Sequence, residues 1–449
     1  MKVDIKKQLL TKEPKDLMLQ LSIPAVLGML VIGLYPLMDG IFAGQIIGQK
    51  AMSAISISMP LTFLNTATAT LVGVGSASIL SRALGEGNQK ITSKIMGNLT
   101  AWIIFISLSI TVLGIIFAKQ FLMIAGATDE ISALAFRYLR IVFIGSVFVN
   151  FTQSSNMVIR GQGLMKEAMK IMVLGALLNI ILDPIFMIAL KDKGIEGAAI
   201  ATVLAQMVQA LMTLNYFKKK SVNVKINKIK FEKEIYVEMF MVGVSAMLMQ
   251  LLFMIQQTLL YRVAFEYGGE DGGILMAASM RLYSFSFIPL WGMSQGLQPV
   301  IGTNFGAKKY NRVKRTMNVF MFGGIILAAV FWIPAQLFPQ SLLKIFNVSD
   351  SIINNGVNNF RMFYSVYILY GIMVMNVTFF QSIGHGKKAG KIVLLRQLIF
   401  FVPCILLFPK YFGVIAVWYT QPLVDFIMIV VGYIMQKNTL RNMLKLKAA

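Results

Sequence analysis

Cysteine and histidine are almost missing from this chain of 449 residues, which has one of each, Cys404 and His385. One cysteine excludes an internal disulfide and a thiolate metal site, and one histidine excludes a histidine cluster. Charge is also scarce, because 14% of the residues are charged, whereas a soluble domain has about 25%. A redox or metal centre of these kinds and a soluble globular fold are therefore not expected.

Hydrophobic residues make up 57% of the chain and gather in long runs. A helix needs about 20 apolar residues to cross the hydrocarbon core of a bilayer. Lone strands cannot satisfy their backbone groups in lipid, so these runs predict membrane-spanning helices. Twelve spans are expected, at residues 17–43, 52–77, 95–118, 138–158, 170–190, 196–217, 236–261, 274–301, 317–338, 360–383, 392–409 and 414–435.

The net charge of +23 does not indicate a nucleic-acid partner, because the basic residues lie in short segments between apolar runs rather than in one basic domain. If the N-terminus is inside, 30 of the 42 Lys and Arg residues fall on that side of the membrane. Segments rich in Lys and Arg remain in the cytoplasm. We therefore expect a multi-pass protein of the bacterial inner membrane, embedded in the lipid bilayer, with both termini in the cytoplasm.

The chain resembles itself at an offset of 221 residues, which places Gly75 on Gly296 and Gly163 on Gly384 without a gap. Many such matches at one offset indicate a duplication. Each half has six spans, so both halves have the same orientation and are expected to be related by a pseudo-twofold axis along the membrane normal, around a central cavity.

The predicted fold is thus an all-α polytopic membrane protein with about twelve transmembrane helices in two six-helix bundles. The bundles are expected at residues 1–217 and 236–449. A basic cytoplasmic linker at 218–235 is expected to join them and to lie near anionic lipid headgroups.

Seven short motifs occur along the chain, at residues 23–24, 39–44, 81–88, 160–163, 179–184, 197–206 and 302–307. In this order and partly in duplicate, they resemble the multidrug and toxic compound extrusion (MATE) family over nearly the whole length. The chain looks most like the bacterial branch that has its acidic site in the N-terminal half.

This resemblance implies a secondary antiporter, not an enzyme, that exports amphipathic, often cationic drugs in exchange for protons or sodium ions. No phosphate-binding motif G-x-x-x-x-G-K-[ST] occurs in the sequence, so no ATP coupling is expected. The expected partner is an amphipathic small molecule, the expected cofactor is none beyond the H+ or Na+ coupling ion, and we expect a monomer.

Two alternatives stay open. The first is a flippase or exporter of a lipid-linked or anionic metabolite, which would need several cationic residues in the cavity. The second is a channel or receptor without coupled transport, which a duplicated bundle with intramembrane acids disfavours.

Acidic residues inside membrane spans are costly and indicate functional sites. Asp39 and Asp183 lie at similar depth in the outer halves of the first and fifth spans. Asn179 lies one helical turn before Asp183, Tyr35 one turn before Asp39, and Thr202 at comparable depth. Carboxylates, an amide and hydroxyl groups can surround a small cation, and two carboxylates can share a proton. Alternatively, both acids merely pair with structural donors.

The resemblance assigns cation coupling to these five matching residues, with Na+ at Asp39 and Asp183 as the one metal ion expected. Some relatives keep their acids in the seventh and tenth spans. Apart from Glu238 at the start of the seventh, those spans contain no acid here, which disfavours a sodium site in the C-terminal half.

Three further predictions concern single spans. Pro24 and Pro36 interrupt the first span, and we interpret them as a conformational switch or as a static kink. The fourth span has the polar residues Asn150, Gln153 and Asn156, which predict either a polar cavity or hydrogen bonds between helices. Asp425, in the last span, belongs to such a cavity or pairs with Arg396.

Overall fold

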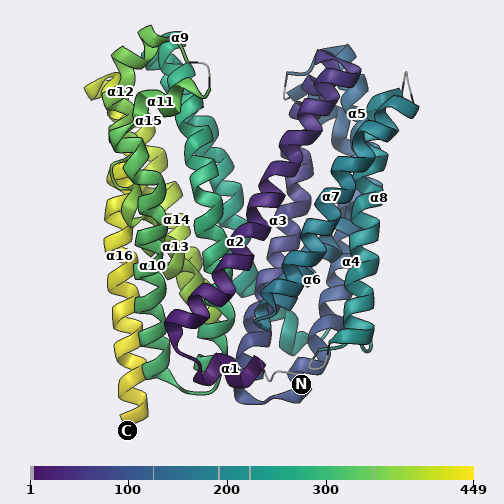
Figure 1. The fold of residues 1–449 in the computed structure, drawn as a ribbon, viewed down its shortest axis with the longest axis vertical. Coiled ribbons are helices and arrows are strands. Elements are labelled where there is room, and N and C mark those ends of the chain that lie inside the picture. Colours follow the sequence, from purple (N-terminus) through teal and green to yellow (C-terminus); the bar gives the residue numbers. More distant parts are fainter. Residues whose placement is uncertain (1–4, 125, 191–192, 222–223, 347, 449) are drawn as a thin grey trace. The chain divides into compact units, whose positions relative to one another are not determined.

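The computed structural model describes residues 5–124, 126–190, 193–221, 224–346 and 348–448, and only the backbone of 34–37 and 446–448 (Figure 1). All the regular elements in these ranges are helices. They are α1 (Ile5–Thr11), α2 (Pro14–Phe42), η1 (Ala43–Ile47), α3 (Gln49–Glu86), α4 (Gln89–Ile124), α5 (Asp129–Ile144), α6 (Ser146–Gly161), α7 (Met165–Ala189), α8 (Gly194–Asn215), η3 (Tyr216–Lys220), α9 (Lys233–Gly306), α10 (Tyr310–Leu337), α11 (Pro339–Lys344), α12 (Asp350–Tyr364), α13 (Tyr367–Ser382), α14 (Gly386–Leu394), η4 (Leu395–Phe401), α15 (Val402–Phe412) and α16 (Val414–Ala448), where η denotes a π-helical segment.

The predicted all-α membrane fold is confirmed. Among the described helices, ten are long and apolar enough to cross a bilayer, and the pair α5 and α6, bent by 55°, adds an eleventh span. Helix α9 contains two predicted spans, 236–261 and 274–301, on either side of Gly269, where the backbone leaves the helical conformation. The count of about twelve spans therefore agrees with the sequence pattern.

The outward faces of these helices are apolar, as lipid contact requires. On α4, for example, Phe105, Leu108, Val112 and Ile116 each leave more than half of their surface exposed. A row of large apolar side chains without protein neighbours is stable only when lipid covers it. The chain is thus a multi-pass membrane protein.

The chain forms two compact units, Leu27–Gly243 and Met1–Val26 with Val244–Ala449. The N-terminal segment belongs to the second unit because α1 docks on the helix ends of that unit. The side-chain amide of Asn304 donates to the carbonyl oxygen of Leu9 at 2.9 Å, and Lys309 donates to that of Leu10 at 3.2 Å. Helix α1 and the C-terminal end of α16 lie at the same end of this unit (Figure 1).

The internal repeat is visible in the helix boundaries. Helices α4, α5, α6 and α7 begin 221 residues before α10, α12, α13 and α14. Positive φ angles recur at the same offset, at Gly48 and Gly269 and at Gly163 and Gly384. The chain therefore reverses direction at matching positions in both halves, and the register shifts only before α8 and α16.

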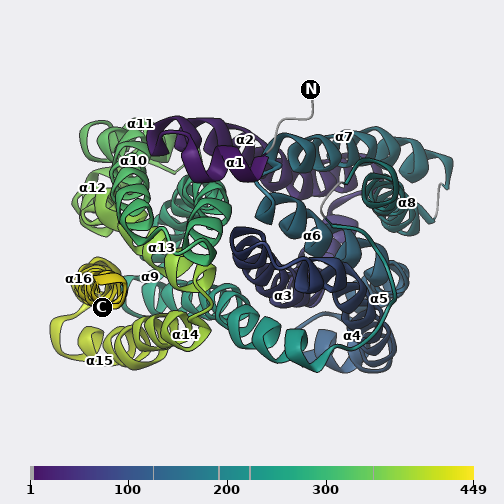
Figure 2. The ribbon, with the colours of Figure 1, turned by 90° about the horizontal axis from the view of Figure 1, so that it is seen from below.

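In the unit Leu27–Gly243, close helix packing depends on small residues. Helix α6 lies against α3 and α7 lies against α8 (Figure 2). A Cβ atom on Gly73 of α3 would collide with the backbone of Ser154 on α6, and one on Gly197 of α8 would collide with the carbonyl group of Phe186 on α7. Glycine at these positions lets the helices approach closely, which brings the polar groups of α7 and α8 together.

Candidate functional site

Asp39 and Asp183 meet inside the unit Leu27–Gly243. Asp39 lies near the C-terminal end of α2 and is 7% exposed, whereas Asp183 lies in α7 and is completely buried. Their carboxyl groups are within hydrogen-bonding contact of each other. A carboxylate oxygen only accepts hydrogen bonds, so this contact is favourable only when a proton or another cation lies between the two groups.

Asn179 and Thr202 complete the polar cluster. The side-chain amide of Asn179 donates to Oδ1 of Asp183 at 3.0 Å and lies 3.4 Å from Oγ1 of Thr202. Both residues are at most 4% exposed. The spacing of one helical turn therefore places Asn179 beside Asp183, and the close packing of α8 on α7 supplies Thr202.

Three acceptor oxygens of this cluster are buried without a donor from the described residues, namely Oδ1 of Asp39, Oδ2 of Asp183 and Oδ1 of Asn179. Leaving a buried acceptor unpaired costs about 1–3 kcal/mol and more for a charged group. Oxygen atoms grouped in this way are suitable ligands for a hard cation.

Tyr138, on α5, is a fifth side chain at this site, and the sequence did not indicate it. It is 7% exposed and lies close enough to both carboxyl groups to interact with their charge. Its depth at the outer end of the fourth span could have indicated it, but a tyrosine in a span is common and, unlike an acid, gives no signal of its own.

Of the predicted residues Pro24, Tyr35 and Pro36 on α2, the structure describes only the side chain of Pro24, and its predicted role as a switch stays a prediction. Pro24 is buried in α2, two residues before the point at which the chain passes from one compact unit to the other. Tyr35 and Pro36 lie in the stretch of α2 whose side chains are outside the described residues. Their predicted roles therefore stay predictions.

The polar residues of the fourth span lie on α6. Asn150 donates to Oγ of Ser107 at 2.9 Å, and Asn156 donates to the carbonyl oxygen of Ala168 at 2.9 Å. Gln153 is half-buried. Asn150 and Asn156 thus form hydrogen bonds that hold α6 against α4 and α7. This is the second of the two interpretations given for the polar residues of this span.

Asp425 lies on α16 in the other unit, where it forms an ion pair with Arg396. Oδ1 of Asp425 is 2.7 Å from Nε of Arg396, and both side chains are almost fully buried. The guanidinium group also donates to Gln256 and Gln397, at 3.2 and 2.8 Å, and lies over the ring of Tyr370. Of the two alternatives for Asp425, the structure shows the ion pair with Arg396.

Comparisons with known proteins agree with this architecture. The MatE family model matches residues 24–185 and 239–406. The multidrug export protein MepA of Staphylococcus aureus (strain MRSA252) is 27% identical over 406 residues, which cover 89% of this chain and 88% of that protein. A crystal structure of MATE in the bent conformation is 26% identical, with a TM-score of 0.94 and complete coverage of both chains. An outward-facing multidrug resistance MATE family transporter of the MOP superfamily is 26% identical, with a TM-score of 0.88 and 98% coverage of both chains.

Proposed function

Since the chain belongs to the MatE family, we propose that it is a secondary active antiporter that exports amphipathic, cationic small molecules in exchange for protons or sodium ions. Two relatives support export of drugs, because one is named a multidrug export protein and the other is described as a multidrug resistance transporter. In this proposal the protein is a transporter rather than an enzyme. It works as a monomer in the bacterial inner membrane, with both termini in the cytoplasm.

The observation that carries the proposal is the group of buried oxygen atoms on Asp39, Asn179 and Asp183 that have no donor among the described residues, at the point where the two carboxyl groups interact. In this arrangement a cation removes both the repulsion between the acids and the cost of the unpaired acceptors. A proton does so by joining the carboxyl groups. A sodium ion does so by accepting several oxygen ligands, to which Thr202 and Tyr35 are proposed to contribute.

Binding of the cation is proposed to change the shape of α2, which carries Asp39 as well as Pro24 and Pro36. A ligand shifts a conformational equilibrium only by binding one state more tightly than the other. Neutralising the acid pair favours the state in which the two carboxyl groups touch, and releasing the cation favours their separation. Pro24 lies two residues before the point at which α2 passes from one unit to the other.

The cargo is proposed to be cationic because the charged residues buried within the spans of the N-terminal half are the acids Asp39 and Asp183. The buried Arg396, which an anionic cargo would need, is already paired with Asp425. The 31 methionine and 50 aromatic side chains of the chain offer flexible and polarisable contacts for flat organic cations.

The test is efflux of ethidium from cells that lack their own drug pumps. Wild type, Asp39→Asn and Asp183→Asn are compared at equal expression, with the proton and sodium gradients collapsed separately. Asp129→Asn is the matched control, because it is the same substitution at an exposed position of the same unit. We expect efflux to stop in both site variants, to continue in the control, and to depend on one of the two gradients, which identifies the coupling ion.

Two results would contradict the proposal in different ways. If both site variants export ethidium as the wild type does, the acid pair is not the coupling site. If the wild type moves no organic cation although the protein is present in the membrane, the cargo is wrong, and translocation of an anionic lipid-linked molecule becomes the function to measure.

A further inference from the structure

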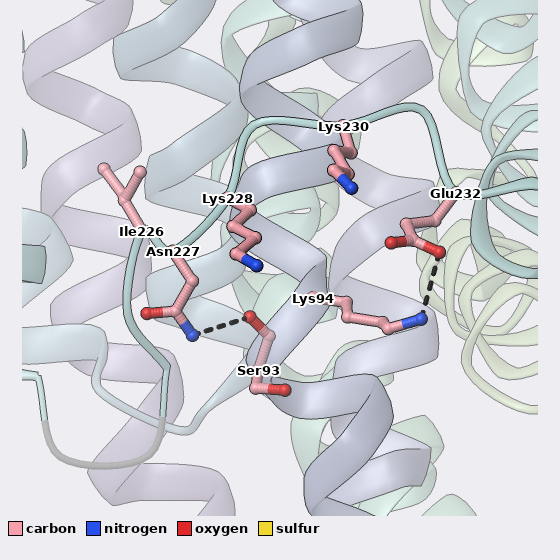
Figure 3. A pocket seen from close by; sticks show the side chains of 7 residues that line it. All are labelled: Ser93, Lys94, Ile226, Asn227, Lys228, Lys230 and Glu232. Carbon is pink, nitrogen blue, oxygen red and sulfur yellow. Dashed lines mark hydrogen bonds and ion pairs between the residues drawn. The ribbon is translucent and has the colours of Figure 1, made fainter.

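The basic segment after η3 lies along one end of α4 and forms a groove with it. The groove has a volume of about 720 Å³ and is lined by Ser93 and Lys94 of α4 and by five residues of the segment, Ile226, Asn227, Lys228, Lys230 and Glu232 (Figure 3). All of these residues belong to the compact unit Leu27–Gly243. The groove lies near the N-terminal end of α4, whereas Asp39 lies near the C-terminal end of α2.

Specific contacts hold the segment in place. The backbone N–H of Glu232 donates to Oδ1 of Asn98 at 3.0 Å, and the side-chain amide of Asn227 donates to the carbonyl oxygen of Ser93 at 3.2 Å. The carbonyl oxygen of Lys228 lies so close to Gly97 that no side chain would fit there. These contacts hold the segment against α4, so the groove is a defined part of the fold rather than one position of a solvated loop.

The groove has an excess of positive charge. Lys94 is neutralised by Glu232, whose Oε2 lies 3.0 Å from the lysine Nζ. The Nζ atoms of Lys228 and Lys230 point into the groove (Figure 3), and in the described part of the chain neither lysine forms an ion pair. Two uncompensated ammonium groups on one side of a groove predict an anionic ligand.

The same segment presents apolar side chains next to these lysines. Residues 228–231 read Lys-Ile-Lys-Phe, so that basic and apolar side chains alternate in the sequence. Ile229 is 53% exposed and Phe231 is 54% exposed. The ring of Phe231 lies 4.9 Å from that of Trp102 and 6.4 Å from that of Phe105, on the apolar face of α4.

We propose that this groove binds the phosphate headgroup of an anionic phospholipid. Lys228 and Lys230 bind the phosphate, while the acyl chains lie along Phe231, Trp102 and the exposed face of α4. Basic side chains at the end of a membrane helix attract anionic headgroups, and the apolar neighbours distinguish a lipid from a soluble anion. None of its residues belongs to the proposed cation site.

Fluorescence quenching of Trp102 measures this binding on the full-length protein. The protein is reconstituted in phosphatidylcholine vesicles with increasing amounts of phosphatidylglycerol brominated on its acyl chains, and brominated phosphatidylcholine serves as the reference lipid. The signal of Trp102 is the difference from the Trp102→Phe variant. A lysine near the bilayer surface raises the affinity for an anionic lipid about five-fold, so we expect phosphatidylglycerol to be preferred roughly 25-fold where both lysines act.

The double variant K228Q/K230Q is expected to lose this preference. The double variant K218Q/K219Q removes the same charge from exposed lysines of the same linker, outside the groove, and is expected to keep the preference. Equal preferences in the two variants would overturn the assignment, because general charge attraction would then explain the binding. Reversal of the quenching by millimolar inorganic phosphate would also overturn it, since the groove would then bind a soluble anion.

Discussion

The Nε atom of Arg396 lies 2.7 Å from Oδ1 of Asp425, and both side chains are almost fully buried. Gln256 and Gln397 accept further hydrogen bonds from the same guanidinium group. A buried charge whose partner is removed is strongly unfavourable, whereas removal of both charges costs much less.

We therefore expect Asp425→Asn to lower the free energy of unfolding by about 3–5 kcal/mol. The double variant Arg396→Gln with Asp425→Asn is expected to lose less than either single variant. Thermal unfolding of the purified proteins measures all three. If the losses of the single variants add up in the double variant, the two charges are not coupled.

Asn179 offers a second prediction, which rests on the proposed coupling site. Asn179→Ala removes the amide that donates to Asp183 at 3.0 Å and an oxygen ligand of the site. Loss of such a contact costs about 1–3 kcal/mol, so we expect the apparent affinity for the coupling ion to fall roughly 5- to 150-fold. Efflux measured against the concentration of that ion gives the value.

Asn150→Ala is the matched control for this measurement. Asn150 lies in the same unit and is equally buried, but it donates to Ser107 rather than to an acid. Its loss is expected to lower the thermal stability and to leave the ion dependence unchanged. Equal shifts of the ion dependence in both variants would mean that Asn179 acts only as a structural residue.

The internal repeat offers a third prediction at Gly87 and Lys308, which occupy matching positions after α3 and α9. Their φ angles are +77° and +55°. An L-residue with a side chain pays about 1–2 kcal/mol in this left-handed conformation, and glycine does not. Both positions are exposed, so packing does not interfere.

We expect Lys308→Gly to raise the free energy of unfolding by about 0.5–1 kcal/mol and Gly87→Lys to lower it by about 1–2 kcal/mol. Thermal unfolding of the two variants beside the wild type tests both signs at once. A loss of stability in Lys308→Gly would show that the lysine side chain contributes more than its backbone conformation costs.

The sequence predicts the spans and the acid pair for the same physical reason. Lipid excludes polar groups, so apolar runs have to be helices, and acids inside them, such as Asp39 and Asp183, stand out. Features that carry no such energetic cost in lipid cannot be recognised from the sequence. Tyr138 is one aromatic residue among many, and the contact between Leu9 and Asn304 joins residues far apart in the chain. Gly97 and Asn98, which position the linker, look like ordinary residues of a span.

Gly97 gives the last prediction. Alanine has the higher helix propensity, so Gly97→Ala would stabilise an isolated helix by about 1 kcal/mol. In this protein, however, a Cβ atom would collide with the carbonyl oxygen of Lys228. The segment would then be displaced from α4, and the contacts made by Asn227 and Glu232 would weaken.

We expect limited trypsin digestion to cleave after the lysines of residues 218–233 several-fold faster in Gly97→Ala than in wild type, because a displaced segment opens more often. Gly390→Ala is the control, since a Cβ atom on that helical glycine makes only an ordinary contact with Ser245 at 3.8 Å. It should leave the cleavage rate unchanged. Because helix propensity and the collision act in opposite directions, an unchanged or slower cleavage of Gly97→Ala would mean that the linker is not held against α4 at this point.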